Sequence, residues 1–262
     1  MKKNQLVIFV TSFEDSLDCE KYFELSLLKY WPDCPYKLYL ANNAEGRSNY
    51  SGQFPLISAP RSDWKGETQH QLMILKERHP ECSHVLMMLD DFVFGSTVNT
   101  SMISAVQDLA CRNELNYVRL RKVESSFIGS LVLKKDDSGL CLVPQRHPYY
   151  SSLQCAIWKI DHLLELLDRC GSIWNFEEQV GDFGHRSTGR TLLHYQHIVE
   201  KGMWDTSAEA WCVKTLGFFE PGDRETIRRS SMIRMKIMVS KISFFIFGYT
   251  LSRLRKTIRF LN

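Results

Sequence analysis

The sequence has no closely spaced cysteine pair. Its eight cysteines lie at positions 19, 34, 82, 111, 141, 155, 170 and 212, and none forms a C-x-x-C motif. No cysteine or histidine spacing in the sequence alone indicates a zinc site. Several cysteines stand in apolar runs, such as Cys155 in QCAIW. We therefore expect reduced, buried thiols that pack as small hydrophobic side chains, as in a cytosolic protein.

The chain also lacks an interdomain linker, an internal repeat and a low-complexity tract. No Pro/Gly/Ser-rich stretch divides its 262 residues, which are enough for one large domain with a buried core. The first apolar run, Leu6–Val10, is too short for a secretory signal and is typical of a buried strand. We expect one domain over residues 1–222 and an appendage over 223–262.

Positive charge is scarce in the body of the chain and concentrated at its end. Residues 1–222 carry 23 basic and 28 acidic side chains, whereas residues 223–262 carry ten basic and two acidic ones. The body has no basic stripe of the kind that nucleic-acid binding requires, so we expect no nucleic-acid partner. This concentration of positive charge indicates that the tail, and not the body, has a partner that the charge attracts.

The tail has no apolar run long enough to span a bilayer. Its uncharged stretch, Ile242–Leu251, has ten residues, whereas a spanning helix needs about 20. Phe, Ile, Leu and Met alternate with Arg and Lys over 233–261. This pattern predicts a basic amphipathic helix that lies on an anionic membrane surface. The alternative is a helix that packs on the domain or on a partner chain.

Apolar runs and helical periods alternate along the body, which predicts an α/β fold. Leu6–Val10, a helix over Cys19–Tyr30 and Tyr36–Leu40 form a β-α-β unit, so the sheet is expected to be parallel there. Further strands are expected at His84–Leu89, Tyr117–Leu120, Phe127–Leu133, Leu140–Val143 and the start of 152–168. Further helices are expected at Gly66–Arg78, Asn99–Cys111, Ile160–Leu167 and residues 190–200.

The most informative motif is an apolar strand that ends in two carboxylates, Leu86-Met87-Met88-Leu89-Asp90-Asp91. Open α/β sheets bind ligands at the carboxyl ends of their strands. Adjacent side chains point to opposite faces, so one carboxylate can contact an ion and the other a ribose or a loop. Carboxylates with substrate phosphates are typical ligands of Mg²⁺ or Mn²⁺. The alternative is a turn with solvated acids.

This motif resembles the acidic DxD motif of the GT-A glycosyltransferases. The resemblance covers about residues 5–215 and implies a GT-A-like mixed sheet flanked by helices. It also implies a nucleotide-sugar donor, a divalent metal and a nucleotide base near Thr11 and Ser12. The sequence reads Leu-Asp-Asp-Phe, without a strict DxD. Asp91 is the preferred metal ligand and Asp90 the second choice, with Asp90 otherwise placed at the donor.

Two later segments gain a role from the same resemblance. Inverting enzymes of this family place a general base after the metal motif, and Glu178 lies 87 residues after Asp91. Glu177 is the other candidate, and Trp174 suits a sugar face. The structural alternative is that these glutamates lie in the first turn of a helix, where their negative charge interacts favourably with the helix dipole. A late histidine often binds the metal of these enzymes, which indicates His197 or His194, with His185 a weaker candidate.

Two loops complete the expected site. In the segment Pro60–Gly66, Arg61 suits a phosphate and Trp64 a substrate, although the segment also reads as a helix cap around Ser62 and Asp63. In the segment 149–158, Gln154 beside aromatic residues suits an acceptor sugar, and the segment reads equally well as a strand edge entering the core.

These expectations predict a glycosyltransferase that uses a UDP- or GDP-linked sugar. The acceptor is expected to be a hydroxyl of a growing saccharide. The family resemblance together with the tail implies a lipid-linked acceptor on the cytoplasmic face of the membrane, as in the biosynthesis of bacterial surface polysaccharides such as O-antigen or capsule. A nucleotidyltransferase shares the sheet architecture, but Thr11-Ser12-Phe13-Glu14 lacks the glycine and basic residues of a triphosphate loop. A non-catalytic, membrane-tethered scaffold is the alternative from another class.

Overall fold

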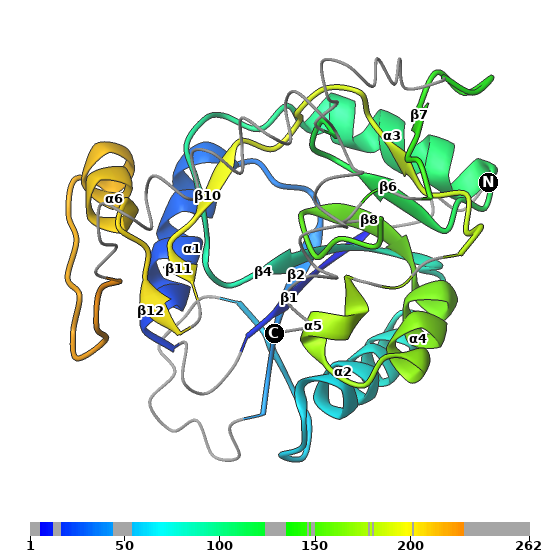
Figure 1. Ribbon diagram of the computed structural model, residues 1–262. Helices are drawn as coiled ribbons and strands as arrows, with labels where there is room; N and C mark the ends of the chain where they lie inside the picture. Colours follow the sequence, from blue (N-terminus) through cyan, green and yellow to red (C-terminus); the bar gives the residue numbers. More distant parts are fainter. Residues whose placement is uncertain are drawn as a thin grey trace, which may run out of the picture.

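A computed structural model describes residues 6–12, 17–43, 54–123, 135–145, 147, 150–177, 179, 181–200 and 202–227. Its core is an eight-stranded mixed sheet with the strand order β3-β2-β1-β4-β8-β6-β9-β7. Helices cover both faces of this sheet (Figure 1). The arrangement is the mixed α/β sheet flanked by helices that the sequence predicted.

The first half of the sheet is parallel. β1 (Val7–Thr11) lies between β2 (Lys37–Asn42) and β4 (His84–Leu89), and β3 (Leu56–Ser58) extends it beyond β2. α1 (Leu17–Tyr30) connects β1 to β2, and α2 (Trp64–Arg78) connects β3 to β4. These β-α-β units confirm the predicted parallel pairing, and they place the carboxyl ends of four strands at one edge.

The alternation of side chains along the strands divides the core into two layers. Even-numbered residues of β1, such as Ile8 and Val10, pack against α1 and α3 (Thr100–Arg112). Odd-numbered residues, such as Val7 and Phe9, pack against α2, α4 (Ile160–Arg169) and α5 (Ile173–Phe176). Both faces of β1 are buried, which explains why its sequence is continuously apolar.

The second half of the sheet reverses direction. β8 (Ala156–Lys159) is antiparallel to both β4 and β6 (Tyr117–Arg119), and α4 follows it directly, as predicted. β9 (Arg186–Ser187) and β7 (Cys141–Leu142) complete the sheet. The chain turns over residues 136–139, before the strand predicted at Leu140–Val143, and Lys135 forms an antiparallel bridge with Cys141. The strand predicted at Phe127–Leu133 lies outside the described residues.

The helix predicted over residues 190–200 is wrong. This segment forms β10 (Tyr195–His197), which pairs antiparallel with β5 (Phe92–Phe94), and β11 (Val199–Glu200), which pairs with β12 (Met203–Trp204). The ring of Tyr195 stacks on Phe92 with a centroid distance of 4.2 Å. Hydrogen bonds and ring packing against β5 therefore override the local helical pattern.

α6 (Ala208–Leu216) follows β12 and packs against α1. Thr226 forms a parallel bridge with Trp204, so the first residues of the predicted tail pack on the body. The rest of the tail, from residue 228 on, lies outside the described residues. In the part of the chain that the structure describes, no helix combines the length and apolar character needed to cross a bilayer.

Candidate functional site

The candidate site lies at the carboxyl edge of the parallel strands. β1 sits between β2 and β4, and the chain crosses from one side of β1 to the other between β3 and β4. Such a switch point is where open α/β sheets bind ligands, because the connecting loops diverge there and leave a crevice. Thr11 ends β1 and Ser12 follows it, Asn42 ends β2 and Asn43 follows it, and Asp90 and Asp91 follow β4. The structure thus brings together the predicted residues Thr11, Ser12, Asp90 and Asp91.

Asp91 meets His197 across the site. Asp91 lies in the short turn between β4 and β5, and β10 runs beside β5 with His197 opposite Phe92. The distance from His197 Nδ1 to Asp91 Oδ2 is 3.2 Å. The other oxygen, Asp91 Oδ1, is buried and has no hydrogen-bond partner among the described residues. A buried carboxylate oxygen without a donor is costly, so the site is suited to a cation at this oxygen.

Gln154 lies on the other side of His197. Gln154 Nε2 is 2.9 Å from His197 Nε2, and Gln154 Oε1 receives hydrogen bonds from the Tyr195 hydroxyl at 2.6 Å and from Arg121 Nη1 at 3.3 Å. A guanidinium only donates hydrogen bonds, so the Gln154 atom that faces Arg121 is the amide oxygen. The other atom is the amide nitrogen, which donates to His197. His197 Nε2 therefore accepts, and its Nδ1 carries the proton that it donates to Asp91.

Tyr195 completes this chain of directed hydrogen bonds. Its hydroxyl accepts the backbone N–H of Cys155 at 3.0 Å and donates to Gln154. Burial raises the pKa of Tyr195 well above its usual value, so the hydroxyl keeps its proton. The order of donors runs from Cys155 through Tyr195, Gln154 and His197 to Asp91. This order fixes the orientation of the Asp91 carboxylate.

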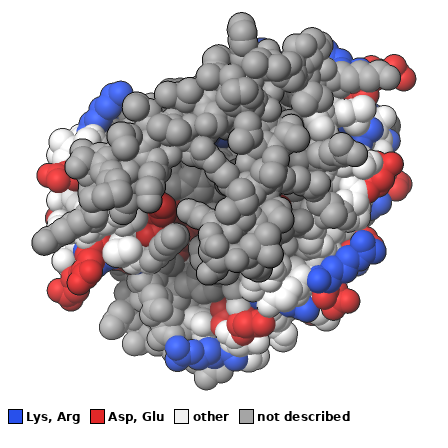
Figure 2. Space-filling model, in the orientation of Figure 1, with Lys and Arg blue, Asp and Glu red and all other residues white. Residues whose placement is uncertain are grey.

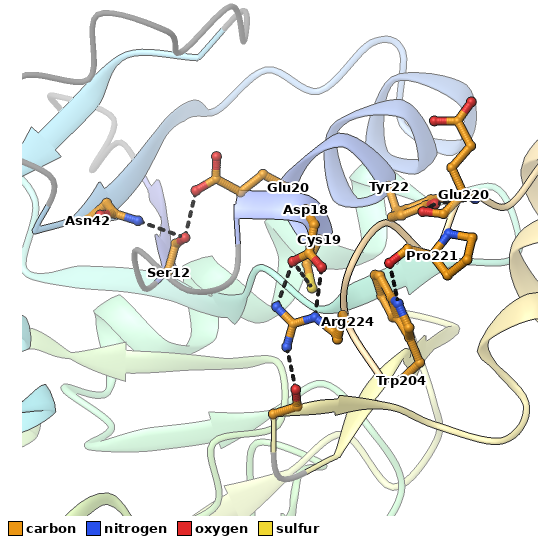
Figure 3. A network of polar contacts seen from close by, with 11 residues as sticks. Ser12, Asp18, Cys19, Glu20, Tyr22, Asn42, Trp204, Glu220, Pro221 and Arg224 are labelled. Carbon is orange, nitrogen blue, oxygen red and sulfur yellow. Dashed lines mark hydrogen bonds and ion pairs between the residues drawn. The ribbon is translucent and has the colours of Figure 1, made fainter. Parts of the chain in front are cut away.

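Asp90 faces a different set of groups. Burial, followed by the charges of Asp90 and Asp18, raises the pKa of the Cys19 thiol, and Arg224 opposes this shift. The side chain of Arg224 donates to both oxygens of Asp18, at 2.7 and 2.6 Å, and to the carbonyl of Gly202 at 2.9 Å (Figure 3). The hydrogen bond to Asp18 is the main cause that raises the pKa of Arg224, and the Asp90 charge adds to it. Asp90 therefore lies near Cys19 and Arg224, whereas Asp91 contacts His197 on β10.

Ser12 is held between α1 and β2. Its hydroxyl donates to Glu20 Oε1 at 2.6 Å and accepts from Asn42 Nδ2 at 3.1 Å (Figure 3). Both hydrogen bonds are buried. Ser12 thus connects the ends of two strands to the first turn of α1.

A second buried carboxylate joins β2 to α2. Glu67 Oε1 accepts from Asn43 Nδ2 at 2.8 Å and from the backbone N–H of Ser62 at 2.9 Å. Asn43 Oδ1 is buried and has no hydrogen-bond partner in the described part of the chain. Since unsatisfied buried acceptors are rare, this oxygen is a candidate ligand contact at the end of β2.

Glu177 packs against the segment that carries Gln154. Glu177 Oε1 accepts from the backbone N–H of Leu153 at 2.9 Å and from the Ser152 hydroxyl at 3.2 Å. Glu178 lies outside the described residues. Trp174 is the second residue of α5. The predicted roles of these three residues in acceptor binding and proton removal stay predictions.

The loop before α2 has the structure of a helix cap. Asp63 is the N-cap residue and accepts from Gly66 N at 2.8 Å, as the structural alternative predicted. Trp64 is 8% exposed and packs on Phe176 with a centroid distance of 5.7 Å, so contact with a substrate would require it to move. Arg61 lies on the surface. Its predicted contact with phosphate stays a prediction.

The two other histidine candidates lie away from Asp91. His194 is exposed, and its backbone carbonyl accepts from Gly95 N. His185 is fully buried beside His162, with 3.0 Å between their Nε2 atoms. Burial, more than any neighbour, lowers the pKa of His185 to about 3. His185 is therefore neutral and packs inside the second half of the sheet.

Several residues of the site were missed from the sequence. Asn42 and Asn43 directly follow a predicted strand, and the same argument that indicated Asp90 applies to them. Arg121 directly follows the predicted strand Tyr117–Leu120, so the same argument applies to it. Tyr195 and Arg224 carry no such signal, because the chain brings them to the site only through β10 and the segment after α6. On the face drawn in Figure 2, the described Lys and Arg side chains are interspersed with Asp and Glu side chains.

Neither a family model nor a curated protein matches this sequence. Several solved structures are similar to it at low sequence identity. The match to S. aureus TarS, residues 1–349, has a TM-score of 0.41 at 12% identity and covers 72% of this chain and 60% of that one. The galactosyltransferase LgtC, in complex with donor and acceptor sugar analogues, gives 0.43 at 13% identity, with 70% of this chain and 73% of that chain covered. A 4-diphosphocytidyl-2C-methyl-D-erythritol synthase from Anaerococcus prevotii gives 0.43 at 12% identity, with 74% and 88% covered.

Proposed function

We propose that this protein is a glycosyltransferase that moves a sugar from a nucleotide-sugar donor to a hydroxyl of a saccharide acceptor. The observation that carries the proposal is Asp91. Its Oδ2 is held by His197, and its Oδ1 is buried without a hydrogen-bond partner among the described residues, at the switch point of the sheet. Crevices at switch points of α/β sheets bind nucleotides and other phosphates.

Asp91 is the proposed ligand of a divalent cation, Mn²⁺ or Mg²⁺. Such an ion binds one or two carboxylates together with substrate phosphates, and it would neutralise the charge of the departing diphosphate. The hydrogen-bond order favours a different role for His197 from the predicted one. Because Nδ1–H donates to Asp91, we propose that His197 orients the carboxylate from outside the coordination sphere, as hydrogen-bonded partners of metal ligands do.

The end of β2 is the proposed site of the donor nucleoside. Asn43 Oδ1 is an acceptor without a described partner, and Glu67 fixes the amide that bears it. Ser12 and Thr11 form the adjacent floor at the end of β1. Arg61 lies on the surface at the start of the loop that Glu67 holds, and its guanidinium suits the donor diphosphate.

Glu177 and Glu178 are the proposed candidates for the acceptor side. A carboxylate that takes the acceptor proton is needed if the sugar configuration inverts, because a neutral hydroxyl is a weak nucleophile. Glu177 is tied to Leu153, the residue before Gln154, so it lies on the Gln154 side of the site. Gln154 and Trp174 are the proposed acceptor contacts.

The tail is proposed to hold the enzyme on an anionic membrane surface, where a lipid-linked acceptor would be reached from the cytoplasmic side. Arg224 forms an ion pair with Asp18 of α1, so its charge is neutralised within the body of the protein. The other nine basic residues of the tail lie beyond residue 227. Vesicle sedimentation of the full chain tests this part: binding should require anionic lipid and weaken with salt, and binding to neutral vesicles alone would contradict it.

A thermal-shift panel tests the donor. The full-length protein is heated with UDP-, GDP- or CMP-sugars or with nucleoside triphosphates, each with Mn²⁺ or with EDTA. Asp91→Asn is compared with Asp108→Asn, an exposed position on α3. A donor at about 100 times its dissociation constant stabilises by about 2.7 kcal/mol. We expect a metal-dependent shift with one nucleotide class, lost only in Asp91→Asn. No shift with any nucleotide would favour the scaffold, and a shift with nucleoside triphosphates alone would favour a nucleotidyltransferase.

A further inference from the structure

Three potential metal ligands lie together at the opposite end of β4. His79, Glu81 and Cys82 each offer one ligand atom, and these atoms lie within 4.8 Å of one another. The group precedes β4, whereas Asp90 and Asp91 follow it. A six-residue strand separates the two ends by about 20 Å. The cluster is therefore distinct from the proposed donor site.

A tight turn brings these side chains together. His79 is the C-cap residue of α2, with its N–H bonded to the carbonyl of Leu75, and Cys82 N donates to the carbonyl of His79 at 2.9 Å. Pro80 occupies the second position of this turn, where its fixed φ angle is favourable. Two residues separate His79 from Cys82, a spacing that zinc sites also use between ligands.

The histidine is oriented as a ligand would be. His79 Nε2 is 2.9 Å from the Tyr39 hydroxyl, and His79 Nδ1 is 3.4 Å from Glu81 Oε1. Because a carboxylate only accepts, His79 Nδ1–H donates to Glu81 when no ion is bound. With a cation between Nδ1 and Glu81, the ring N–H would be on Nε2 and would donate to the Tyr39 hydroxyl. Metal-binding histidines commonly donate their second ring N–H to an oxygen in this way. His79 and Cys82 are buried, and Glu81 is exposed and gives access from solvent.

We propose that His79, Glu81 and Cys82 form a binding site for a thiophilic divalent cation such as Zn²⁺. A thiolate, an imidazole and a carboxylate suit Zn²⁺, whereas Mg²⁺ and Mn²⁺ prefer oxygen ligands. Three protein ligands leave one tetrahedral position for water. On binding, the ion replaces the thiol proton of Cys82, which leaves to solvent. The bound ion would clamp the end of α2 to the start of β4 and, through Tyr39, to β2.

Cobalt spectroscopy on the full-length, EDTA-treated protein tests this site. We expect a thiolate-to-cobalt charge-transfer band that saturates at one Co²⁺ per chain in excess Mg²⁺, which fills the oxygen-ligand site at Asp91. Zn²⁺ should remove this band and Mg²⁺ should not. The band should disappear in Cys82→Ser and persist in Cys34→Ser, a half-buried cysteine outside the cluster. Tyr39→Phe, which lacks the hydroxyl, should retain the band and bind Co²⁺ about tenfold more weakly.

The same titration can overturn the proposal. No charge-transfer band in the wild-type protein, or a band that survives Cys82→Ser, rejects the site. His79→Ala gives a second decision in case Cys82→Ser fails to fold. Its circular dichroism is compared with that of the wild type, and a folded His79→Ala variant with unchanged cobalt affinity would equally reject the proposal.

Discussion

The buried histidine His185 should make the protein sensitive to acid. Its Nδ1–H donates to the carbonyl of Tyr150 at 3.2 Å, and its Nε2 lies 3.0 Å from Nε2 of His162. Burial lowers the pKa of His185 from 6.5 to about 3, and the nearby charges of Arg119 and Arg186 act in the same direction. Between about pH 3 and pH 6.5, His185 is therefore neutral in the folded protein, whereas the same histidine in the unfolded chain binds a proton.

The sign and size of the effect follow from this difference. Because the pKa is lower in the folded state, stability is complete above the unfolded value of 6.5 and is lost as the pH falls toward 3. The loss is about 1.4 kcal/mol per pH unit within this window. Between about pH 7.5 and pH 5, His185 alone should lower the free energy of unfolding by about 2 kcal/mol.

Urea unfolding at a series of pH values measures this loss. His185→Asn keeps an N–H near the position of Nδ1 and removes the titration, so its free energy of unfolding should fall by about 2 kcal/mol less over the same range. His70→Asn, an exposed position on α2, is the control and should follow the wild type. Parallel pH profiles for the wild type and His185→Asn would refute the reasoning.

Three further predictions concern the contacts around the site. His197→Ala should lower the Mn²⁺ affinity about 10- to 100-fold. Electron spin echo spectra of Mn²⁺ bound to the wild type should show no coupling to a directly coordinated histidine nitrogen, and a coupling of this kind would make His197 a ligand. Arg224→Ala should destabilise the protein by about 2 kcal/mol in urea unfolding, because Asp18 loses a partly buried partner, whereas Lys76→Ala in the exposed pair with Asp161 should cost less than about 0.5 kcal/mol. Gly95→Ala should cost about 1–3 kcal/mol, since the new methyl group would overlap the Trp211 ring and force it to move. Gly171→Ala, with 3.6 Å to its nearest neighbour, should be close to neutral by the same measurement.

The parallel half of the fold was predictable because its signals are local. β4 has the predicted bounds, and β1 and α1 differ from prediction by a few residues. Continuous apolar runs identify strands that are buried on both faces. The acids after β4 could therefore be placed at the carboxyl edge before the structure was known, since parallel strands bring their ends together.

The β10 side of the site was not predictable in the same way. His197 was identified as a candidate but assigned to a helix, because its strand exists only through pairing with β5. Tyr195, Arg121 and Arg224 reach the site through contacts between segments far apart in sequence. The turn that collects His79, Glu81 and Cys82 was also missed, since its spacing acquires meaning only when the side chains are seen to converge.

Mn²⁺ binding followed by electron paramagnetic resonance tests the central claim most directly. The signal of free Mn²⁺ is measured with the full-length protein in the presence and absence of a nucleoside diphosphate of the class selected by thermal shift. The account predicts that nucleotide tightens Mn²⁺ binding, that Asp91→Asn weakens it at least tenfold, and that Asp108→Asn leaves it unchanged. Equal Mn²⁺ binding by the wild type and Asp91→Asn would contradict the assignment of Asp91 as the metal ligand at the donor site.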